Sequence, residues 1–307
     1  MCRLGDYCKA LALTRFHQKH CTTNAFAHFF WTVMADIIDN VRDSILDAIK
    51  TDRITLPTLP EVALNVREVA RDPDTTVIAL CKVLEKDAAI AARVIKVANS
   101  PLFRGGKAID NLKTATTRLG VRYTANLATG IAMKQMFQAT TSLVDEILRA
   151  TWTNSTEIAA YAHAYAQLQP GLHPDQASLA GLTYRIGVLP ILTFAEEHPK
   201  LLSNPELLNT IIESAHQDIG MHILRAWDFP DEIIVVPKQY LNFERDIPNA
   251  DYADLVAVSA LQGAENSAHP LHHIDIAKVK AFDRLGLRQA ATEAEQNQMI
   301  EHIELAA

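Results

Sequence analysis

The stretch EKDAAIAARVIKVANSP, residues 85–101, shows most clearly how this chain folds. Its side chains Ile90, Val94 and Val97 recur at spacings of three and four, so they form one apolar stripe along a helix. Alanines and a further isoleucine flank the stripe. The Asn-Ser-Pro at 99–101 ends the pattern, because the residue before a proline disfavours helical geometry. The stretch therefore predicts an amphipathic helix over 87–99 with one face in a core.

The same helical period continues on both sides of this stretch. Pro57 and Pro60 interrupt it, Asp and Thr residues at 72–75 provide capping oxygens, and Gly120 separates two further helices. No segment alternates with a period of two for long enough to indicate a sheet. We therefore expect an all-α fold, a multi-helix bundle in two lobes. Helices are expected over 34–50, 60–70, 77–84, 87–99, 110–119, 121–138, 142–168, 175–197, 205–226, 230–241, 250–264 and 274–285.

Length, charge and cysteine content limit the functional classes. The chain has 307 residues, 49% of them apolar and 21% charged, which suits a globular protein with a sizeable core. The net charge of −7 gives no general attraction to nucleic acid or anionic lipid. No apolar run approaches the roughly 18 residues of a membrane span, and no signal peptide is recognisable. Four cysteines do not indicate a disulfide framework, so a reducing cytoplasm is the expected location.

Residues 1–33 differ in composition from the rest of the chain. They carry four basic side chains and one acidic one, which is a net charge of +3. Because the whole chain carries −7, the remaining residues carry −10. They also hold three of the four cysteines, together with His17 and His20 beside Cys21. A zinc site is one interpretation, but no closely spaced ligand pair occurs. We favour an atypical extension, either disordered or the product of a start assigned upstream of Met34.

The order of motifs resembles the HDOD domain family. Residues 56–103 are similar to the opening of that domain: they begin Leu-Pro-Thr-Leu-Pro, include Asp72-Pro73 and end in the helix described above. The segments SLAGLTYRIGVLPIL, 178–192, and HQDIGMHILRAWDFPDEII, 216–234, continue the likeness. The resemblance spans about 50–260 and implies an HD-domain-like helical fold. We expect a first lobe over 34–140, a second over 141–290 and a tail over 291–307.

The related HD phosphohydrolases bind divalent metal through histidines and aspartates centred on an adjacent His-Asp pair. Imidazoles and carboxylates hold the ion, and the ion lowers the pKa of a bound water so that it can attack phosphorus. In this chain Tyr184 and Arg185 stand where that pair would be. Asn154 and Tyr240 replace further histidines, and only His216 keeps a ligand type. Neutral tyrosine is a poor ligand and arginine repels a cation. The resemblance therefore implies a degenerate metal site, no catalytic residue, and no metal or other cofactor.

Arg185 places a permanent charge in an apolar segment and so needs a partner. One hypothesis is that its guanidinium occupies the space of the metal's charge, pairing with a carboxylate such as Glu157 or holding an anion. The alternative is that Tyr184 and Arg185 lie on a solvent face or in a static ion pair.

Other candidate sites are weaker. A metal site at His272, His273 and Asp275 is conceivable, but adjacent histidines in a proline-broken loop rarely converge on one ion. His163, His222 and Cys81 have apolar neighbours and are expected to be packed. The Gly-Gly-Lys at 105–107 lacks the remaining P-loop residues. The basic residues Arg93, Lys96, Arg104 and Lys107 are expected on a solvated face.

We therefore expect a non-catalytic bacterial signal-transduction module that acts by binding a signalling protein or a small anionic ligand such as a nucleotide or other phosphate. A homodimer is compatible with the alanine-rich helices. The alternative is a metal-dependent phosphohydrolase with a rearranged site, built from His216 with His163, His222 and carboxylates such as Asp218 or Asp231. Nucleic-acid regulation is a third hypothesis, which the acidic balance disfavours.

Overall fold

The fold is seen in a computed structural model that describes residues 40–48, 51, 57–100, 103, 108–139, 141–264, 271 and 274–287. Within these ranges every regular element is a helix, which confirms the all-α fold class. The predictions for the extension over 1–33 and for the tail over 291–307 lie outside the described residues. So do Arg104, Lys107, His272 and His273.

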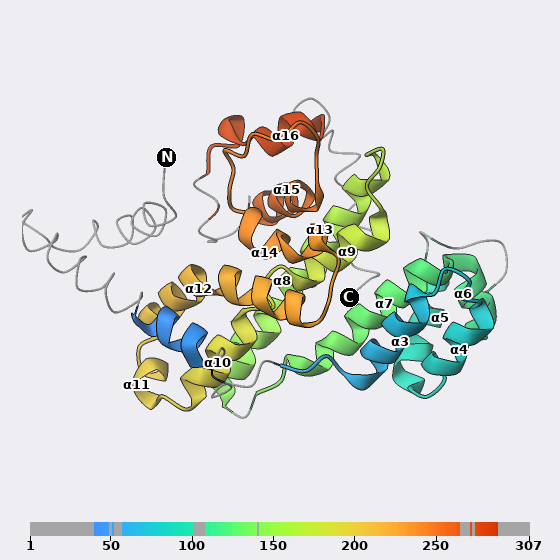
Figure 1. Cartoon of the computed structure of the whole chain (residues 1–307), viewed down its shortest axis with the longest axis horizontal. Helices are drawn as coiled ribbons and strands as arrows, with labels where there is room; N and C mark the ends of the chain where they lie inside the picture. The colour runs from blue at the N-terminus through green and yellow to red at the C-terminus, as the bar shows by residue number, and fades with distance from the viewer. Residues whose placement is uncertain are drawn as a thin grey trace, which may run out of the picture.

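The first lobe consists of five helices with side-chain caps at three of their N-termini. Asp87 accepts hydrogen bonds from the backbone N–H groups of Ala89 and Ile90, Thr76 accepts one from Ala79, and Asn111 caps the next helix in the same way. Figure 1 shows these helices at one end of the molecule. Their bounds are α3 Glu61–Arg71, α4 Val77–Leu84, α5 Ala88–Ala98, α6 Leu112–Leu119 and α7 Val121–Met133.

The second lobe is organised around the two longest described helices, α8 and α12, and around α9, which packs along α8. A 3₁₀ turn, η1 Lys134–Met136, connects the two lobes. The helices of the second lobe are α8 Ser142–Gln167, α9 Pro174–Thr183, α10 Val188–Glu196, α11 Pro199–Leu202, α12 Pro205–Ala226, α13 Asp231–Ile234, α14 Val236–Gln239, α15 Tyr252–Ala264 and α16 Lys280–Arg284, with the 3₁₀ turn η3 Ile276–Lys278.

A short helix over 40–48 precedes α3 and buries Ile45 and Ala48. In Figure 1 it lies on the side of α10–α12, at the opposite end of the molecule from α4–α6. This helix therefore lies apart from the helices α4–α6 of the first lobe.

Three segments expected to be single helices are interrupted. The helix expected over 175–197 is divided by a turn at 184–187 into α9 and α10. The segment over 230–241 forms α13 and α14, because Pro237 in the first turn of α14 has no N–H to continue the preceding helix. The segment over 274–285 forms only η3 and the five-residue α16.

The stretch Pro174–Glu196 contains an 18-residue window with a mean hydropathy of 1.4, so by length and composition it could cross a membrane. By length and composition alone, the prediction that no apolar run approaches the length of a membrane span was therefore wrong. In the structure 72% of this window is buried, as in core helices generally. Leu179, Ile186 and Leu192 are among its buried side chains.

Candidate functional site

The predicted site residues come together where α8, the 184–187 turn, α12 and α14 meet. The turn is held by backbone hydrogen bonds to the third residue back: Ile186 N–H donates to Thr183 and Val188 N–H donates to Arg185, both at 3.0 Å. Gly187 brings the turn against α12, since a Cβ there would lie 2.0 Å from the carbonyl oxygen of His216. The break between α9 and α10 therefore positions Tyr184 and Arg185 beside α12.

Tyr184 is buried, with 2% of its surface exposed, and its hydroxyl donates a hydrogen bond to Oδ1 of Asn154 on α8. Its ring meets that of Tyr240 edge-on, with 4.9 Å between centroids. Burial raises the pKa of Tyr184 above that of a free phenol. The hydroxyl therefore stays protonated and serves as a donor.

His216 continues the polar chain from Tyr240. Its Nδ1 lies 2.8 Å from the carbonyl oxygen of Ile212, an obligate acceptor, so Nδ1 carries the proton. Nε2 then accepts from the Tyr240 hydroxyl at 3.0 Å. Burial and the nearby Arg185 charge lower the pKa of His216 to about 4. The imidazole is therefore neutral at pH 7, and its one lone pair is engaged by Tyr240.

Arg185 pairs with Glu213 on α12. Its two terminal nitrogens lie 2.6 and 3.3 Å from the two carboxylate oxygens, a bidentate arrangement. Burial acts to lower the pKa of Arg185, but the Glu213 carboxylate outweighs it and holds that pKa above its ordinary value. The side chains are 12% and 22% exposed, so the pair lies near the surface but mostly covered.

The expected pairing of Arg185 with Glu157 is replaced by this contact with Glu213. Burial raises the pKa of Glu157. The charge of the Glu157 carboxylate in turn contributes to the raised pKa of Tyr184. The sequence did carry a signal for Glu213, because it precedes His216 by three residues on the same helix and so shares its face. The family motif places a metal ligand at His216 and none at Glu213, so it does not point to Glu213.

The remaining candidate ligands do not join His216. Nδ1 of His163 lies 3.1 Å from the carbonyl oxygen of Pro174, and His222 bonds to the carbonyl oxygen of Asp218 in its own helix. The Asp218 carboxylate pairs with Lys238. Among the described residues, no three His, Cys, Asp or Glu side chains are grouped so that they could hold a metal ion. The donor set therefore does not fit the divalent metal of HD phosphohydrolases.

Asp275, from the weaker His-rich candidate, accepts a hydrogen bond from the backbone N–H of Ala277 and caps η3. Cys81 is buried, as expected, and its sulfur lies 3.6 Å from the hydroxyl of Thr116. Neither residue belongs to the group around His216.

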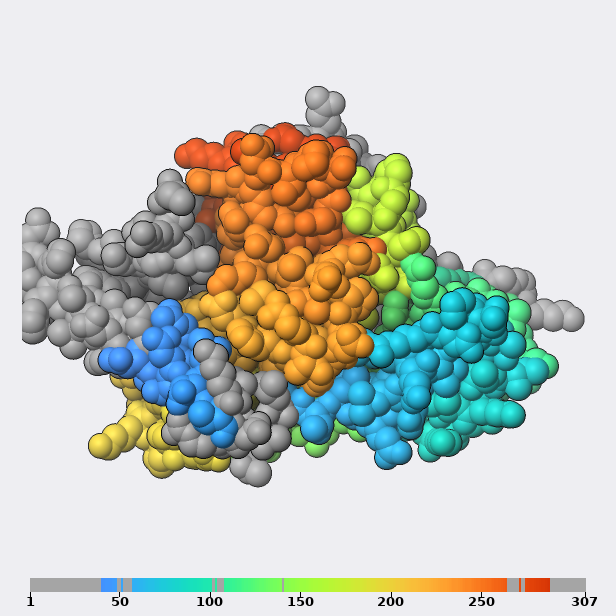
Figure 2. Space-filling view, in the orientation of Figure 1, coloured from blue at the N-terminus to red at the C-terminus, as the bar shows by residue number. Residues whose placement is uncertain are grey.

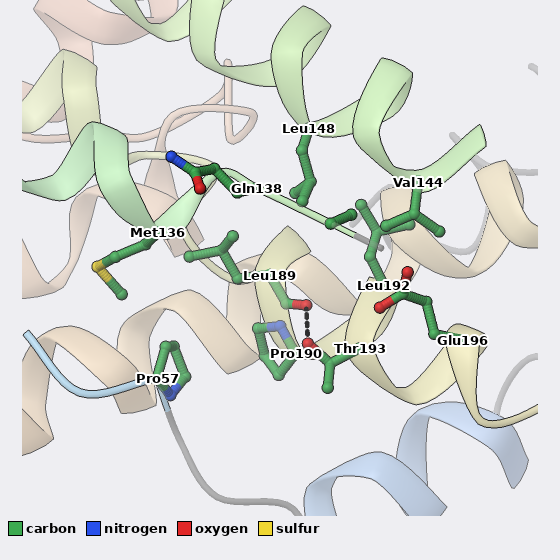
Figure 3. A pocket seen from close by; sticks show the side chains of 11 residues that line it. Pro57, Met136, Gln138, Val144, Leu148, Leu189, Pro190, Leu192, Thr193 and Glu196 are labelled. Atoms are coloured by element: carbon green, nitrogen blue, oxygen red, sulfur yellow. Dashed lines mark hydrogen bonds between the residues drawn. The ribbon is translucent and has the colours of Figure 1, made fainter. Parts of the chain in front are cut away.

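A separate cavity of about 120 Å³ lies beneath the connection between the lobes (Figure 3). Most of its lining residues are apolar, but polar and apolar atoms contribute about equally to its surface. Glu196 at its edge already accepts hydrogen bonds from Thr141. The cavity contains none of the five predicted site positions. The residues around it are Pro57, Met136, Gln138, Ala139, Val144, Leu148, Leu189, Pro190, Leu192, Thr193 and Glu196.

Comparison with known structures places the chain among proteins of the same fold. A protein of Shewanella amazonensis SB2B, provisionally named a metal-dependent phosphohydrolase, shares 31% identity, with a TM-score of 0.77 over 88% of this chain and 99% of that one. An HDOD domain protein of Geobacter sulfurreducens shares 16% identity, with a TM-score of 0.59 over 89% of this chain and 98% of that one. At that identity the likeness shows the fold alone.

Sequence comparison agrees with the structural one. An uncharacterised protein of Treponema pallidum (strain Nichols) is 24% identical over 229 residues, which are 68% of this chain but 42% of that protein. The chain thus matches less than half the length of this relative. The family model of the HDOD domain matches residues 56–240, more than half of the chain. The chain therefore belongs to the HDOD domain family.

Proposed function

We propose that this chain is a non-catalytic signal-transduction module that works by binding a partner protein. The observation that carries the proposal is the state of the five former ligand positions. Tyr184 bonds to Asn154, Tyr240 bonds to His216, and Arg185 bonds to Glu213. Each of these side chains has its partner inside the protein. The association of the HDOD family with bacterial signalling supports the functional class.

Metal-assisted hydrolysis needs a set of free lone pairs that converge on one ion. Here the imidazole lone pair of His216 accepts from a phenol whose pKa is raised by burial, so that phenol remains a donor. A guanidinium 12% exposed lies in the same group and repels cations. These features oppose activation of a water molecule at this position.

Binding of a small anion at Arg185 is the weaker form of the proposal. An incoming phosphate would compete with the Glu213 carboxylate, which already engages both terminal nitrogens of the guanidinium. The geometry therefore disfavours a free phosphate or nucleotide as the partner of Arg185.

The rival function is metal-dependent phosphohydrolysis at a rearranged site. The name of the Shewanella relative, at 31% identity, favours it. The test is hydrolysis of bis(p-nitrophenyl) phosphate and of nucleotides by the full chain with added Mn²⁺, Fe²⁺ or Mg²⁺. We expect the same background rate from wild type, from wild type with chelator and from His216→Gln. A wild-type rate that chelator or His216→Gln abolishes would contradict the proposal.

The anion hypothesis has its own readout. Inorganic phosphate and nucleotides are titrated against wild type and Arg185→Gln, and the melting temperature is followed. We expect equal shifts in the two proteins, because Glu213 already occupies the guanidinium. A stabilisation that saturates in wild type and disappears in Arg185→Gln would instead assign an anion site to Arg185.

A further inference from the structure

The turn that follows α12 contacts the first lobe through its backbone. α12 ends at Ala226, and Asp228 adopts a left-handed conformation with φ of 55°. The N–H of Phe229 returns to the carbonyl of Leu224 at 3.0 Å, which closes the helix end. This reversal turns the carbonyl oxygens of Trp227 and Asp228 towards arginines of α3.

Arg67 of α3 binds this turn at three points. One terminal nitrogen donates to the carbonyl oxygen of Trp227 at 2.7 Å, and the other donates to that of Asp228 at 2.8 Å. Its guanidinium carbon lies 3.8 Å from the centroid of the Phe229 ring. One side chain of the first lobe therefore recognises both the backbone and an aromatic face of the second.

Two more contacts complete the junction. Arg71, one turn further along α3, donates to the carbonyl oxygen and the carboxylate of Asp228. The indole N–H of Trp227 donates to the carbonyl oxygen of Pro57, just before α3, at 2.9 Å. Figure 2 shows the orange surface of the second lobe against the light-blue surface that leads into α3. We call this set, Arg67, Arg71, Trp227, Asp228 and Phe229, the latch.

A second junction between the lobes, α7 against α9, is packed differently. The side chain of Leu182 on α9 lies over Gly130 of α7, where a Cβ would be 2.4 Å from it. Asp175 of α9 accepts hydrogen bonds from Arg122 and Asn126 of α7. Its core is close-packed, and separating it would expose apolar surface to water.

The Arg71 side of the latch, in contrast, is held by polar contacts that water can replace, whereas Trp227 and Phe229 are buried in the apolar core. The side chains of Arg71 and Asp228 are 56% and 80% exposed. Ion pairs this exposed contribute little to stability, and carbonyl groups freed from an arginine can bond to water. The arginine contacts of the latch therefore separate at lower free energy than the close-packed α7–α9 junction.

The latch is joined to the site through one helix. α12 carries Glu213 and His216 near its middle and the latch turn at its C-terminal end, and Tyr240 follows on the chain after α13 and α14. A displacement of α12 at the site therefore moves the turn that Arg67 and Arg71 hold.

From this arrangement we propose that the latch is a contact between the lobes that can open. When α12 shifts, Arg67 and Arg71 release their hydrogen bonds to the Trp227–Phe229 turn, and the first lobe rotates about the α7–α9 junction. The proposal stands whether or not the site binds metal or anion. It gives the chain a conformational output that a partner of either lobe would sense.

The test is the distance distribution between the lobes, measured by double electron–electron resonance on the full chain. Spin labels are attached to keto amino acids introduced at Lys113 on α6 and Lys278 in η3, so that the native cysteines are untouched. Wild type is expected to give one narrow distribution. Arg67→Gln with Arg71→Gln, which removes both cations, is expected to broaden it and to shift its mean.

Two further variants separate release from unfolding. Trp227→Phe keeps an aromatic side chain but loses the pyrrole part of the indole with the N–H that reaches Pro57, so it is expected to broaden the distribution while retaining the helical circular-dichroism signal. Arg149→Gln removes an exposed pair with Asp145 within α8 and is expected to leave the distribution unchanged. If Trp227→Phe folds and its distribution superimposes on that of wild type, the latch does not set the angle between the lobes and the proposal is wrong.

Discussion

At the scale of single residues, the group around His216 consists of hydrogen bonds that each satisfy a buried atom. A donor or acceptor buried without a partner costs about 1–3 kcal/mol, and the chain of contacts from Asn154 to Ile212 avoids that cost at most of its members. The amide nitrogen of Gln217 and the hydroxyl of Ser155 are buried polar atoms of the described structure without a partner. Most polar atoms of the site therefore have a hydrogen-bond partner inside the protein, so each substitution there removes an identifiable contact.

The neutral state of His216 makes stability depend on pH. Its pKa is about 4 in the folded protein and near 6.5 when unfolded, so the unfolded chain binds the extra proton first as pH falls. The contribution of His216 is therefore complete above about pH 6.5 and is lost progressively down to about pH 4. We expect wild type to lose on the order of 2–3 kcal/mol more than His216→Gln between pH 7 and pH 4.

Urea denaturation of both proteins at several pH values measures this difference directly. Because other groups titrate equally in the two proteins, subtracting one curve from the other isolates His216. Parallel curves would mean that His216 titrates normally in the folded state, and the buried, neutral imidazole would be the wrong description.

The Arg185–Glu213 pair should show strong coupling in a double-mutant cycle. Arg185→Met or Glu213→Leu alone leaves one charge mostly buried without its partner, at a cost of about 2–3 kcal/mol after allowance for partial exposure. The double variant should recover most of that loss, since apolar side chains suit the surroundings. The matched cycle on Arg149 and Asp145, an exposed pair on α8, should show no measurable coupling. Equal coupling in the two cycles would contradict the burial of Arg185.

At the scale of secondary-structure elements, the close approach of the 184–187 turn to α12 depends on Gly187. A Cβ there would lie 2.0 Å from the carbonyl oxygen of His216 and 2.6 Å from the backbone nitrogen of Gly220. We expect Gly187→Ala to lower the free energy of unfolding by about 3 kcal/mol or more, because the backbone of the turn and that of α12 must both move. Gly263→Ala on α15 is the control. Its Cβ would meet atoms no closer than 3.7 Å, so this variant should raise the melting temperature.

Asn99 ties the end of α5 to the segment before α6. Its side-chain amide donates to the carbonyl of Ile109 at 2.7 Å and accepts from the N–H of Ile109 at 2.8 Å. Asn99→Ala should therefore cost about 2 kcal/mol, whereas Asn242→Ala, which removes one exposed bond, should change the unfolding free energy little. Thermal unfolding of both variants checks this. Equal stability of the two would mean that Asn99 ends α5 without holding the segment beyond it.

The positions of most helices could be predicted from the sequence because the apolar period and the capping residues are local. The break at 184–187 could not, since the run from Ala177 to Phe194 is mostly apolar on both sides of Arg185 and the turn depends on contact with α12. The short helices α13 and α14 differ from their prediction for a related reason, because Pro237 interrupts a pattern that is otherwise periodic. Local patterns carry no information about contacts between distant segments.

At the scale of the whole molecule, the family resemblance identified positions that are neighbours where α8, the 184–187 turn, α12 and the end of α14 meet. Asn154, Tyr184, His216 and Tyr240 are far apart in the chain and joined by contacts in the structure. Arg185 pairs with Glu213 on α12 where the sequence had suggested a carboxylate such as Glu157 on α8, because the choice between the two depends on how the helices pack. The latch could not be predicted at all, since nothing in the local sequence links Arg67 and Arg71 to a turn about 160 residues further along the chain.

The central claim is that the side chains around His216 no longer hold a metal. The most direct test is metal analysis of the full chain, purified without chelator and without a metal-binding tag after growth with iron, manganese and zinc. We predict far less than one equivalent of any of these metals in wild type, and no difference between wild type and His216→Gln. One or two equivalents in wild type, lost in His216→Gln, would contradict the account and make phosphohydrolysis the leading function.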